Sequence, residues 1–187
     1  MIDDAGDRIS DPQRRSFLRN CTAMMVLGSG LIPFGVAQAA SSRELQLLNT
    51  HTGERLQQCY FRDGAFAPEA CQRLNHFLRD HRTGDVSAID PRLFDLLYSV
   101  QHEVGHRGTI EIISGYRSHA TNAKLNAASS GVAKRSLHME GKALDIRLSG
   151  FDTARLRDAA LSLRAGGVGY SAKSDFVHMD TGRVRHW

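Results

Sequence analysis

In the stretch KALDIRL, residues 142–148, apolar and polar side chains alternate from Leu144 to Leu148. A period of two residues is typical of a strand with one buried face, so Leu144, Ile146 and Leu148 are expected to point into a core. Asp145 then points to the opposite side of the sheet. Because a charge is not buried unpaired, that side is expected to border a cleft.

The other patterns place helices early in the chain and strands late. We expect a hairpin over 45–61, helices from Pro68 to Arg82, from about Asp90, over Asn122–Ala128 and from Asp152, and β-like runs at 109–115, 168–171 and 175–180. This order fits an α+β domain with a largely antiparallel sheet better than a succession of βαβ units.

Residues 102–106 read HEVGH and match the H-E-x-x-H pattern of zinc-binding protease helices. Gly105 lies inside the match and Gly108 follows it, so the helix is expected to fray at this point. The next residues turn into a strand and supply no third ligand. A histidine at a helix C-terminus also complements the helix dipole. We therefore do not predict the metal site at HEVGH.

A stronger set of metal-ligand residues follows later in the chain. His138 falls in a loop, Asp145 on the polar face of the next strand, and His178 in the late run DFVHMD. Two imidazoles and one carboxylate leave a tetrahedral position open for water, which is the composition of a catalytic zinc site. We predict that these three residues bind Zn2+.

Three separated motifs occur in a fixed order: SGYRS at 114–118, S-x-H-x-x-G-x-A-x-D at 136–145 and VHMD at 177–180. Together they resemble the D-Ala-D-Ala metallopeptidase family, which shares its fold with lysostaphin-like enzymes and the hedgehog domain. LRDHRTG, DPRLFDLL and GRVRHW resemble the murein endopeptidase K branch, exported bacterial hydrolases of peptidoglycan crosslinks. The resemblance implies the α+β hedgehog/DD-peptidase fold, with a central, mostly antiparallel sheet and flanking helices.

The resemblance also implies roles for single residues. His138, Asp145 and His178 match the zinc ligands of the family. Arg117 matches the arginine that binds the substrate and stabilises the oxyanion. Ser136 is expected to donate a hydrogen bond around the ligands, with a plain turn serine as the alternative.

The general base is the point at which the sequence departs from the family pattern. Better known members carry a glutamate three residues before the last histidine ligand, and Asp175 stands in that place. We expect Asp175 to be the base, which requires a bulge or the start of the strand between Asp175 and His178. A loop-capping role is the alternative, and Glu140 and Asp180 are the other candidates.

The function implied by the resemblance is that of a zinc-dependent murein endopeptidase, which hydrolyses peptide crosslinks of peptidoglycan. Two alternatives stay open: a non-catalytic zinc-containing module that binds peptidoglycan, and a carboxypeptidase or dipeptidase of the same chemistry. The net charge of +4 would attract the domain to an anionic wall. No run of Lys and Arg with interleaved aromatics indicates nucleic acid. We expect a monomer.

Residues 1–39 resemble an export signal. Arg14 and Arg15 precede a short apolar stretch that is broken by glycines and a proline, and the stretch ends in the small-x-small sequence Ala37-Gln38-Ala39. This pattern predicts twin-arginine-type export to the periplasm, with 40–187 as the zinc metallopeptidase domain and no stable membrane anchor after cleavage. An uncleaved amphipathic anchor is the alternative.

Two cysteines, Cys59 and Cys71, remain after cleavage of the signal. They form either a disulfide or two free thiols.

Overall fold

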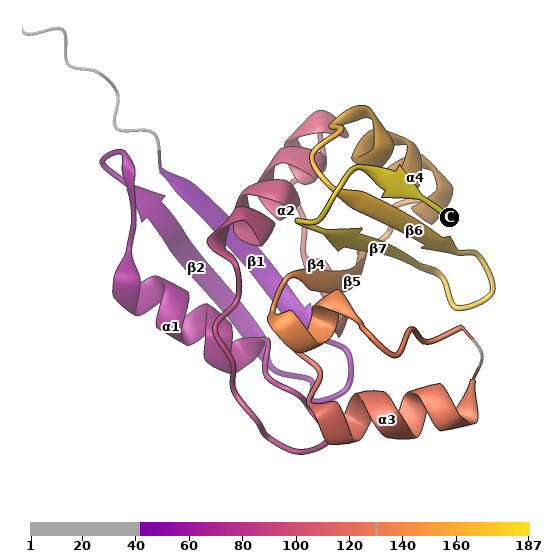
Figure 1. The fold of residues 1–187 in the computed structure, drawn as a ribbon. Helices are drawn as coiled ribbons and strands as arrows, with labels where there is room; N and C mark the ends of the chain where they lie inside the picture. Colours follow the sequence, from indigo (N-terminus) through magenta and orange to yellow (C-terminus); the bar gives the residue numbers. More distant parts are fainter. Residues whose placement is uncertain (1–41, 130) are drawn as a thin grey trace, which may run out of the picture. The chain divides into compact units, whose positions relative to one another are not determined.

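The computed structural model describes residues 42–129 and 131–187 (Figure 1). The export signal predicted at 1–39 lies outside the described residues. Among the residues that are described, no helix combines the length and the apolar character needed to cross a membrane.

One sheet of eight strands organises the described part of the chain, in the order β3-β2-β1-β4-β5-β7-β6-β8. The strands are β1 Arg43–Asn49, β2 Arg55–Arg62, β3 Ala65–Phe66, β4 Ile110–Ser114, β5 Ala143–Leu148, β6 Gly167–Ser171, β7 Phe176–Asp180 and β8 Arg185–His186. The β1–β4 and β6–β8 pairs are parallel, whereas the other pairs are antiparallel. The predicted α+β fold with a mostly antiparallel sheet is therefore confirmed.

Three of the four α-helices in the described residues begin at a residue whose side chain caps the first turn. They are α1 Pro68–Phe77, α2 Pro91–Glu103, α3 His119–Ala128 and α4 Thr153–Ser162, with a 3-10 turn η2 at Leu137–Glu140. Asp90 caps α2 by accepting from the amide of Arg92, and Asp152 caps α4 by accepting from the amide of Arg155. In Figure 1, α1 lies beside β2 and α4 beside β6.

Two helix boundaries differ from the sequence prediction. Helix α1 ends at Phe77 instead of Arg82, because the carbonyl of Leu78 accepts from the amide of Tyr116, and the Arg82 amide donates to the side chain of Asp80. A continued helix would need that carbonyl and that amide for its own bond.

Helix α3 begins earlier than predicted, at His119 instead of Asn122. The hydroxyl of Ser118 accepts from the amide of Thr121 at 3.2 Å and so caps the first turn. The apolar pattern of this short helix is weak, which is why its start could not be placed from periodicity.

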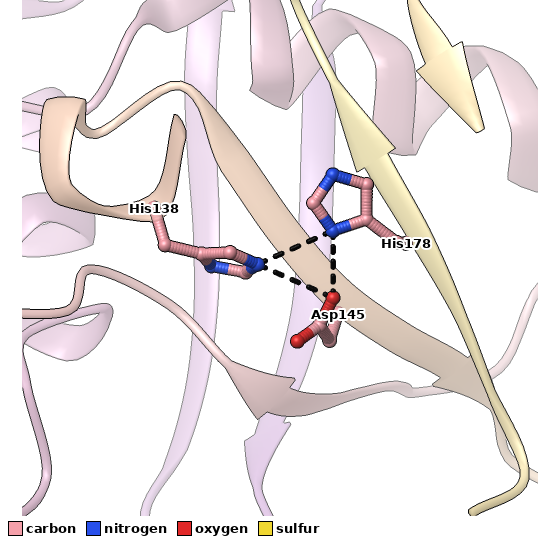
Figure 2. Close-up of side chains that lie close together, drawn as sticks. All are labelled: His138, Asp145 and His178. Atoms are coloured by element: carbon pink, nitrogen blue, oxygen red, sulfur yellow. Dashed lines mark hydrogen bonds and ion pairs between the residues drawn. The ribbon is translucent and has the colours of Figure 1, made fainter. Parts of the chain in front are cut away.

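The core lies between the sheet and the helices. Leu144, Ile146 and Leu148 of β5 are almost completely buried in the core, as predicted for this face of the strand. The helices supply the facing core side chains, which include Leu74 and Phe77 of α1, Leu93, Phe94, Leu97 and Val100 of α2, and Leu156 and Ala160 of α4. Asp145, between Leu144 and Ile146, points toward His138 and His178 (Figure 2).

Cys59 and Cys71 are both free thiols. The thiol of Cys59 donates to the carbonyl of Phe61 at 3.5 Å. The structure therefore agrees with the second of the two alternatives, two free thiols.

Candidate metal centre

His138 is placed by the short turn η2, directly before β5. Ser136 begins the turn and accepts from the amide of His138 at 3.4 Å. Gly141 ends it with φ of 64°, and a Cβ at this position would lie 2.1 Å from the carbonyl oxygen of Ala88. Only glycine fits this left-handed, crowded position. The turn therefore holds His138 in place above the first residues of β5.

Asp145 and His178 are brought together by strand register. The two residues are paired across the antiparallel β5–β7 ladder, so their side chains leave the same face of the sheet. Nδ1 of His178 lies 2.9 Å from Oδ1 of Asp145. A shift of one residue in this ladder would send the two side chains to opposite faces.

The three side chains meet at one point, as Figure 2 shows. Nε2 of His138 lies 3.3 Å from Oδ1 of Asp145 and 3.2 Å from Nδ1 of His178. All three ligand-type atoms are within 4.8 Å of one another. Only 2% of His138 and 7% of Asp145 is exposed, so the group is shielded from water on most sides.

The far side of each imidazole is already occupied by an acceptor. Nδ1 of His138 lies 2.8 Å from the carbonyl of Gly115, and Nε2 of His178 lies 3.1 Å from Oδ2 of Asp180. A carbonyl and a carboxylate only accept, so these two nitrogens carry the hydrogens. In the neutral tautomers, the lone pairs of both rings therefore point at the carboxylate of Asp145. Three acceptors without a hydrogen between them fit a bound cation, so this group could hold a metal ion.

The local field also favours positive charge. Burial acts to raise the pKa of Asp145, but the neighbouring His138 and His178 hold that pKa below its ordinary value. Burial acts to lower the pKa of His178, yet the carboxylates of Asp145 and Asp180 raise it. The two shifts are reciprocal: the imidazoles favour the ionised carboxylate of Asp145, and the two carboxylates favour the protonated form of His178.

Arg117 lies beside this group, in the segment that follows β4. Its Nη2 is 3.6 Å from Oδ2 of Asp145 and donates to the hydroxyl of Ser114 at 3.2 Å. Its amide donates to the carbonyl of His138 at 3.1 Å. The side chain is 9% exposed, and its Nε is buried without a hydrogen-bond partner among the described residues.

The loop that carries Arg117 is fixed from behind by Asp80. The carboxylate of Asp80 accepts from the amides of Ser118 and Arg82, each at 2.9 Å. Asp80 is 1% exposed. Burial acts to raise its pKa, but the surrounding donors hold that pKa well below the ordinary range.

These residues border a cleft of about 370 Å³. Its lining includes Arg117, Ser136, His138, Asp145 and His178, together with Arg135, Tyr170, Phe176, Arg185 and Trp187. Five of the six predicted site residues therefore line one cleft. Ser136 accepts from the backbone as a turn cap, and its predicted hydrogen bond around the ligands stays a prediction.

Asp175 is the predicted residue that does not reach the cleft. It lies in the turn before β7 with φ of 52°. Its carboxylate accepts from the hydroxyl of Thr153 at 2.7 Å and lies 3.5 Å from Nη1 of Arg147. The predicted role of general base therefore has no support from this placement. The left-handed turn directs the side chain toward Thr153 at the start of α4, and the loop-capping alternative stays a prediction.

The other two candidates for the base are also occupied. Glu140 is an exposed residue paired with Lys142 at 2.8 Å. Asp180 is fully buried and accepts from His178 and Arg185. Among the described residues that line the cleft, Asp145 is the one Asp or Glu side chain.

The residues of HEVGH do not share one helix in the structure. Helix α2 ends at Glu103, so His106 lies outside it. Nδ1 of His106 accepts from the amide of Gly108 at 3.2 Å, and Nε2 lies 3.0 Å from the carbonyl of Ser149. Both ring nitrogens are therefore used by the backbone.

Sequence reasoning missed the contacts that support His178. Asp180 was considered only as a base, but it holds the ring of His178 and binds Arg185 through two hydrogen bonds of 3.0 and 2.7 Å. The signal was available in the spacing, because residues two apart on a strand share a face. The position of Trp187 in the lining of the cleft had no such local signal in the sequence.

Comparison with known proteins gives one consistent result. A family model described as "Peptidoglycan L,D-endopeptidase MepK" matches residues 37–187. The protein of that name from Escherichia coli (strain K12) is 44% identical over 180 residues, which covers 95% of this chain and 98% of the relative. A "Probable peptidoglycan L,D-endopeptidase MepK" from Haemophilus influenzae is 41% identical over 167 residues, which covers 87% and 90%. The chain therefore belongs to this family of metallopeptidases, described as peptidoglycan L,D-endopeptidase MepK.

Proposed function

We propose that this protein is a zinc-dependent peptidoglycan endopeptidase, which hydrolyses peptide crosslinks of the cell wall. The observation that carries the proposal is the convergence of His138, Asp145 and His178 from η2, β5 and β7. The names of the relatives support an L,D bond as the one that is cut.

The donor set fits zinc. Two imidazole nitrogens and one carboxylate oxygen, with the cleft on the remaining side, are the composition of catalytic zinc sites with an open fourth position. When bound, zinc supplies Lewis acidity and an activated water as nucleophile. His138 and His178 are held in the ligand tautomer by Gly115 and Asp180, so the protein presents the lone pairs before a metal arrives.

Arg117 would bind the substrate oxygen. Its guanidinium lies beside Asp145, and Arg117 lines the cleft, where its N–H groups could donate to a carbonyl or carboxylate of the substrate. A fixed cationic fork in a dry site stabilises the negative charge that develops on a carbonyl oxygen during hydrolysis. Asp80 and Ser118 hold the loop, so this donor does not have to reorganise during the reaction.

The substrate and the compartment follow from the same proposal. A net charge of +4 favours association with an anionic wall polymer. Residues 1–39, read as a twin-arginine-type signal, would carry the enzyme to the periplasm, where peptidoglycan lies. We propose that the exported domain acts there as a monomer without a membrane anchor.

Digestion of purified sacculi tests the function. The zinc-loaded protein is incubated with sacculi, and the released muropeptides are separated by chromatography; parallel samples contain a chelator or the His138→Ala and Asp145→Ala variants. We expect crosslinked fragments to be consumed by the zinc-loaded protein alone. Variants that keep both their zinc and their activity would contradict the proposal.

The same chromatogram separates the alternatives. A binding module would sediment with sacculi but would release no fragments. A carboxypeptidase would shorten stem peptides and leave the crosslinks in place. Consumption of crosslinked dimers with the appearance of monomers identifies an endopeptidase.

A further inference from the structure

Trp187 is an exposed aromatic side chain beside the candidate metal centre. It is 60% exposed, and its ring centroid lies 5.1 Å from that of His178, with 53° between the ring planes. The indole also lines the cleft. A single exposed apolar residue is normal on a protein surface, but one that lies next to a predicted ligand indicates a binding surface.

The main chain of Trp187 is fixed by hydrogen bonds to β6, and its indole packs over Gly169. The amide of Trp187 donates to the carbonyl of Val168 at 3.3 Å, and its carbonyl accepts from the amide of Tyr170 at 3.2 Å. Gly169 lies under the ring, where a Cβ would come within 2.7 Å of Cε2 of the indole. Gly169 therefore provides the space in which the ring packs flat against β6.

The side chain of Arg185 lies against the indole ring of Trp187. The guanidinium carbon lies 4.8 Å from the Trp187 ring centroid. Arg185 is itself bound by both carboxylate oxygens of Asp180, and Asp180 also accepts from Nε2 of His178. The buried carboxylate of Asp180 therefore contacts both the imidazole of His178 and the guanidinium that lies against the indole. This leaves the indole little freedom relative to the metal centre, so binding to it costs little ordering entropy.

We infer that Trp187 is a substrate-binding residue, and that its indole packs against the aliphatic side chain of the crosslinking amino acid next to the bond that is cut. This inference rests on the proposed function. Indole surfaces bind groups rich in C–H bonds, such as methylene chains and sugar rings. The position of the indole favours the methylene chain over the sugar ring, because the indole lies directly beside the predicted metal ligand His178. The sugar is joined to the far end of the stem peptide, and three extended residues span about 10 Å.

The chain contains one tryptophan, so tryptophan fluorescence reports on Trp187 alone. The full chain, kept with a chelator to prevent turnover, is titrated with a sugar-free crosslinked peptide dimer and, separately, with a peptide-free disaccharide of the glycan. We expect a saturable change in emission with the peptide dimer. A change with the disaccharide alone, or none with the peptide dimer, would overturn the inference.

Kinetics of the zinc-loaded enzyme supply the second readout. Trp187→Ala is expected to raise KM about tenfold, with kcat within about threefold and with the zinc content unchanged, since an aromatic contact of this kind amounts to about one order of magnitude in affinity. Trp187→Phe is expected to recover most of the lost KM. Val184→Ala, an equally exposed residue in the same segment that does not line the cleft, is the matched control.

Three kinetic results would overturn the inference: an unchanged KM in Trp187→Ala, an equal rise in Val184→Ala, or a loss of zinc from Trp187→Ala. The failure of the proposed function is a different result. In that case the wild-type enzyme releases no fragments at all, whereas the fluorescence titration still decides whether the peptide contacts the indole.

Discussion

Asp180 is fully buried, and its carboxylate accepts a hydrogen bond from Nε2 of His178 at 3.1 Å. The same carboxylate accepts from the amides of Gly167 and Gly182 and from Arg185. Its position two residues after His178 on β7 lets it fix the ring from behind. The orientation of the predicted ligand therefore depends on a residue that would not touch the metal itself.

Asp180→Asn is predicted to weaken zinc binding about 10- to 100-fold, because loss of a carboxylate partner of a ligand histidine has effects of this size. The affinity is measured by competition with a chromophoric chelator. Glu140→Gln is the control, since Glu140 is an exposed carboxylate that pairs with Lys142 outside the cleft lining. A folded Asp180→Asn protein with wild-type zinc affinity would refute the supporting role.

Arg117→Lys is predicted to lower kcat about 100-fold with an unchanged zinc content, since removal of a donor to an oxyanion has costs of this order. A lysine keeps the charge but loses the planar fork that donates to Ser114 and that we propose also donates to the substrate. Steady-state hydrolysis of a crosslinked muropeptide measures the effect. Arg157→Lys on α4, where Arg157 pairs with Asp158, serves as the control, and equal rates for the two variants would count against the assignment.

Asp175→Asn is predicted to keep kcat within about threefold, because the side chain contacts Thr153 and Arg147 and does not line the cleft. Asparagine tolerates the left-handed backbone of this turn, so the variant tests proton transfer with little added strain. The pH profile of kcat is measured for both proteins. A loss of 1000-fold or more would restore Asp175 as the general base.

Asp80 is predicted to make stability depend on acid pH. Its pKa in the folded state lies below the unfolded value of about 4, so the folded state is stabilised above that pH and the contribution is lost as the pH falls further. Asp80→Asn should lower the free energy of unfolding at pH 7 by about 2 kcal/mol, the range of hydrogen bonds to a charged group. Urea unfolding at pH 7 and at pH 3 measures both effects.

The difference between wild type and Asp80→Asn is expected to shrink toward pH 3. Asp158→Asn, which removes an exposed carboxylate on α4, is the control and should follow the wild-type pH dependence. A constant difference between wild type and Asp80→Asn at both pH values would contradict the assignment.

The sequence predicted the features that depend on local pattern. The alternation in KALDIRL gave both the buried face of β5 and the direction of Asp145, and the order of three motifs pointed to three residues whose side chains lie together in the structure. Asp175 does not line the cleft, because the place three residues before His178 falls in the turn before β7, where Asp175 has φ of 52°. Strict alternation along the strand also points Asp175 away from His178. No composition or spacing rule reveals such a turn at an aspartate.

The features that escaped prediction depend on contacts between distant segments. Trp187 reaches the cleft because β8 pairs in parallel with β6, a contact that neither segment shows by itself. The end of α1 was likewise set by Tyr116, which takes the carbonyl of Leu78 from a segment far along the chain. Tertiary hydrogen bonding overrode the helical pattern at this point.

Anomalous X-ray diffraction from a zinc-loaded crystal, collected on both sides of the zinc edge, tests the metal centre most directly. The account predicts one strong peak about 2.0 to 2.2 Å from Nε2 of His138, a carboxylate oxygen of Asp145 and Nδ1 of His178. A peak at His102 and His106 instead, or none near these three residues, would contradict it.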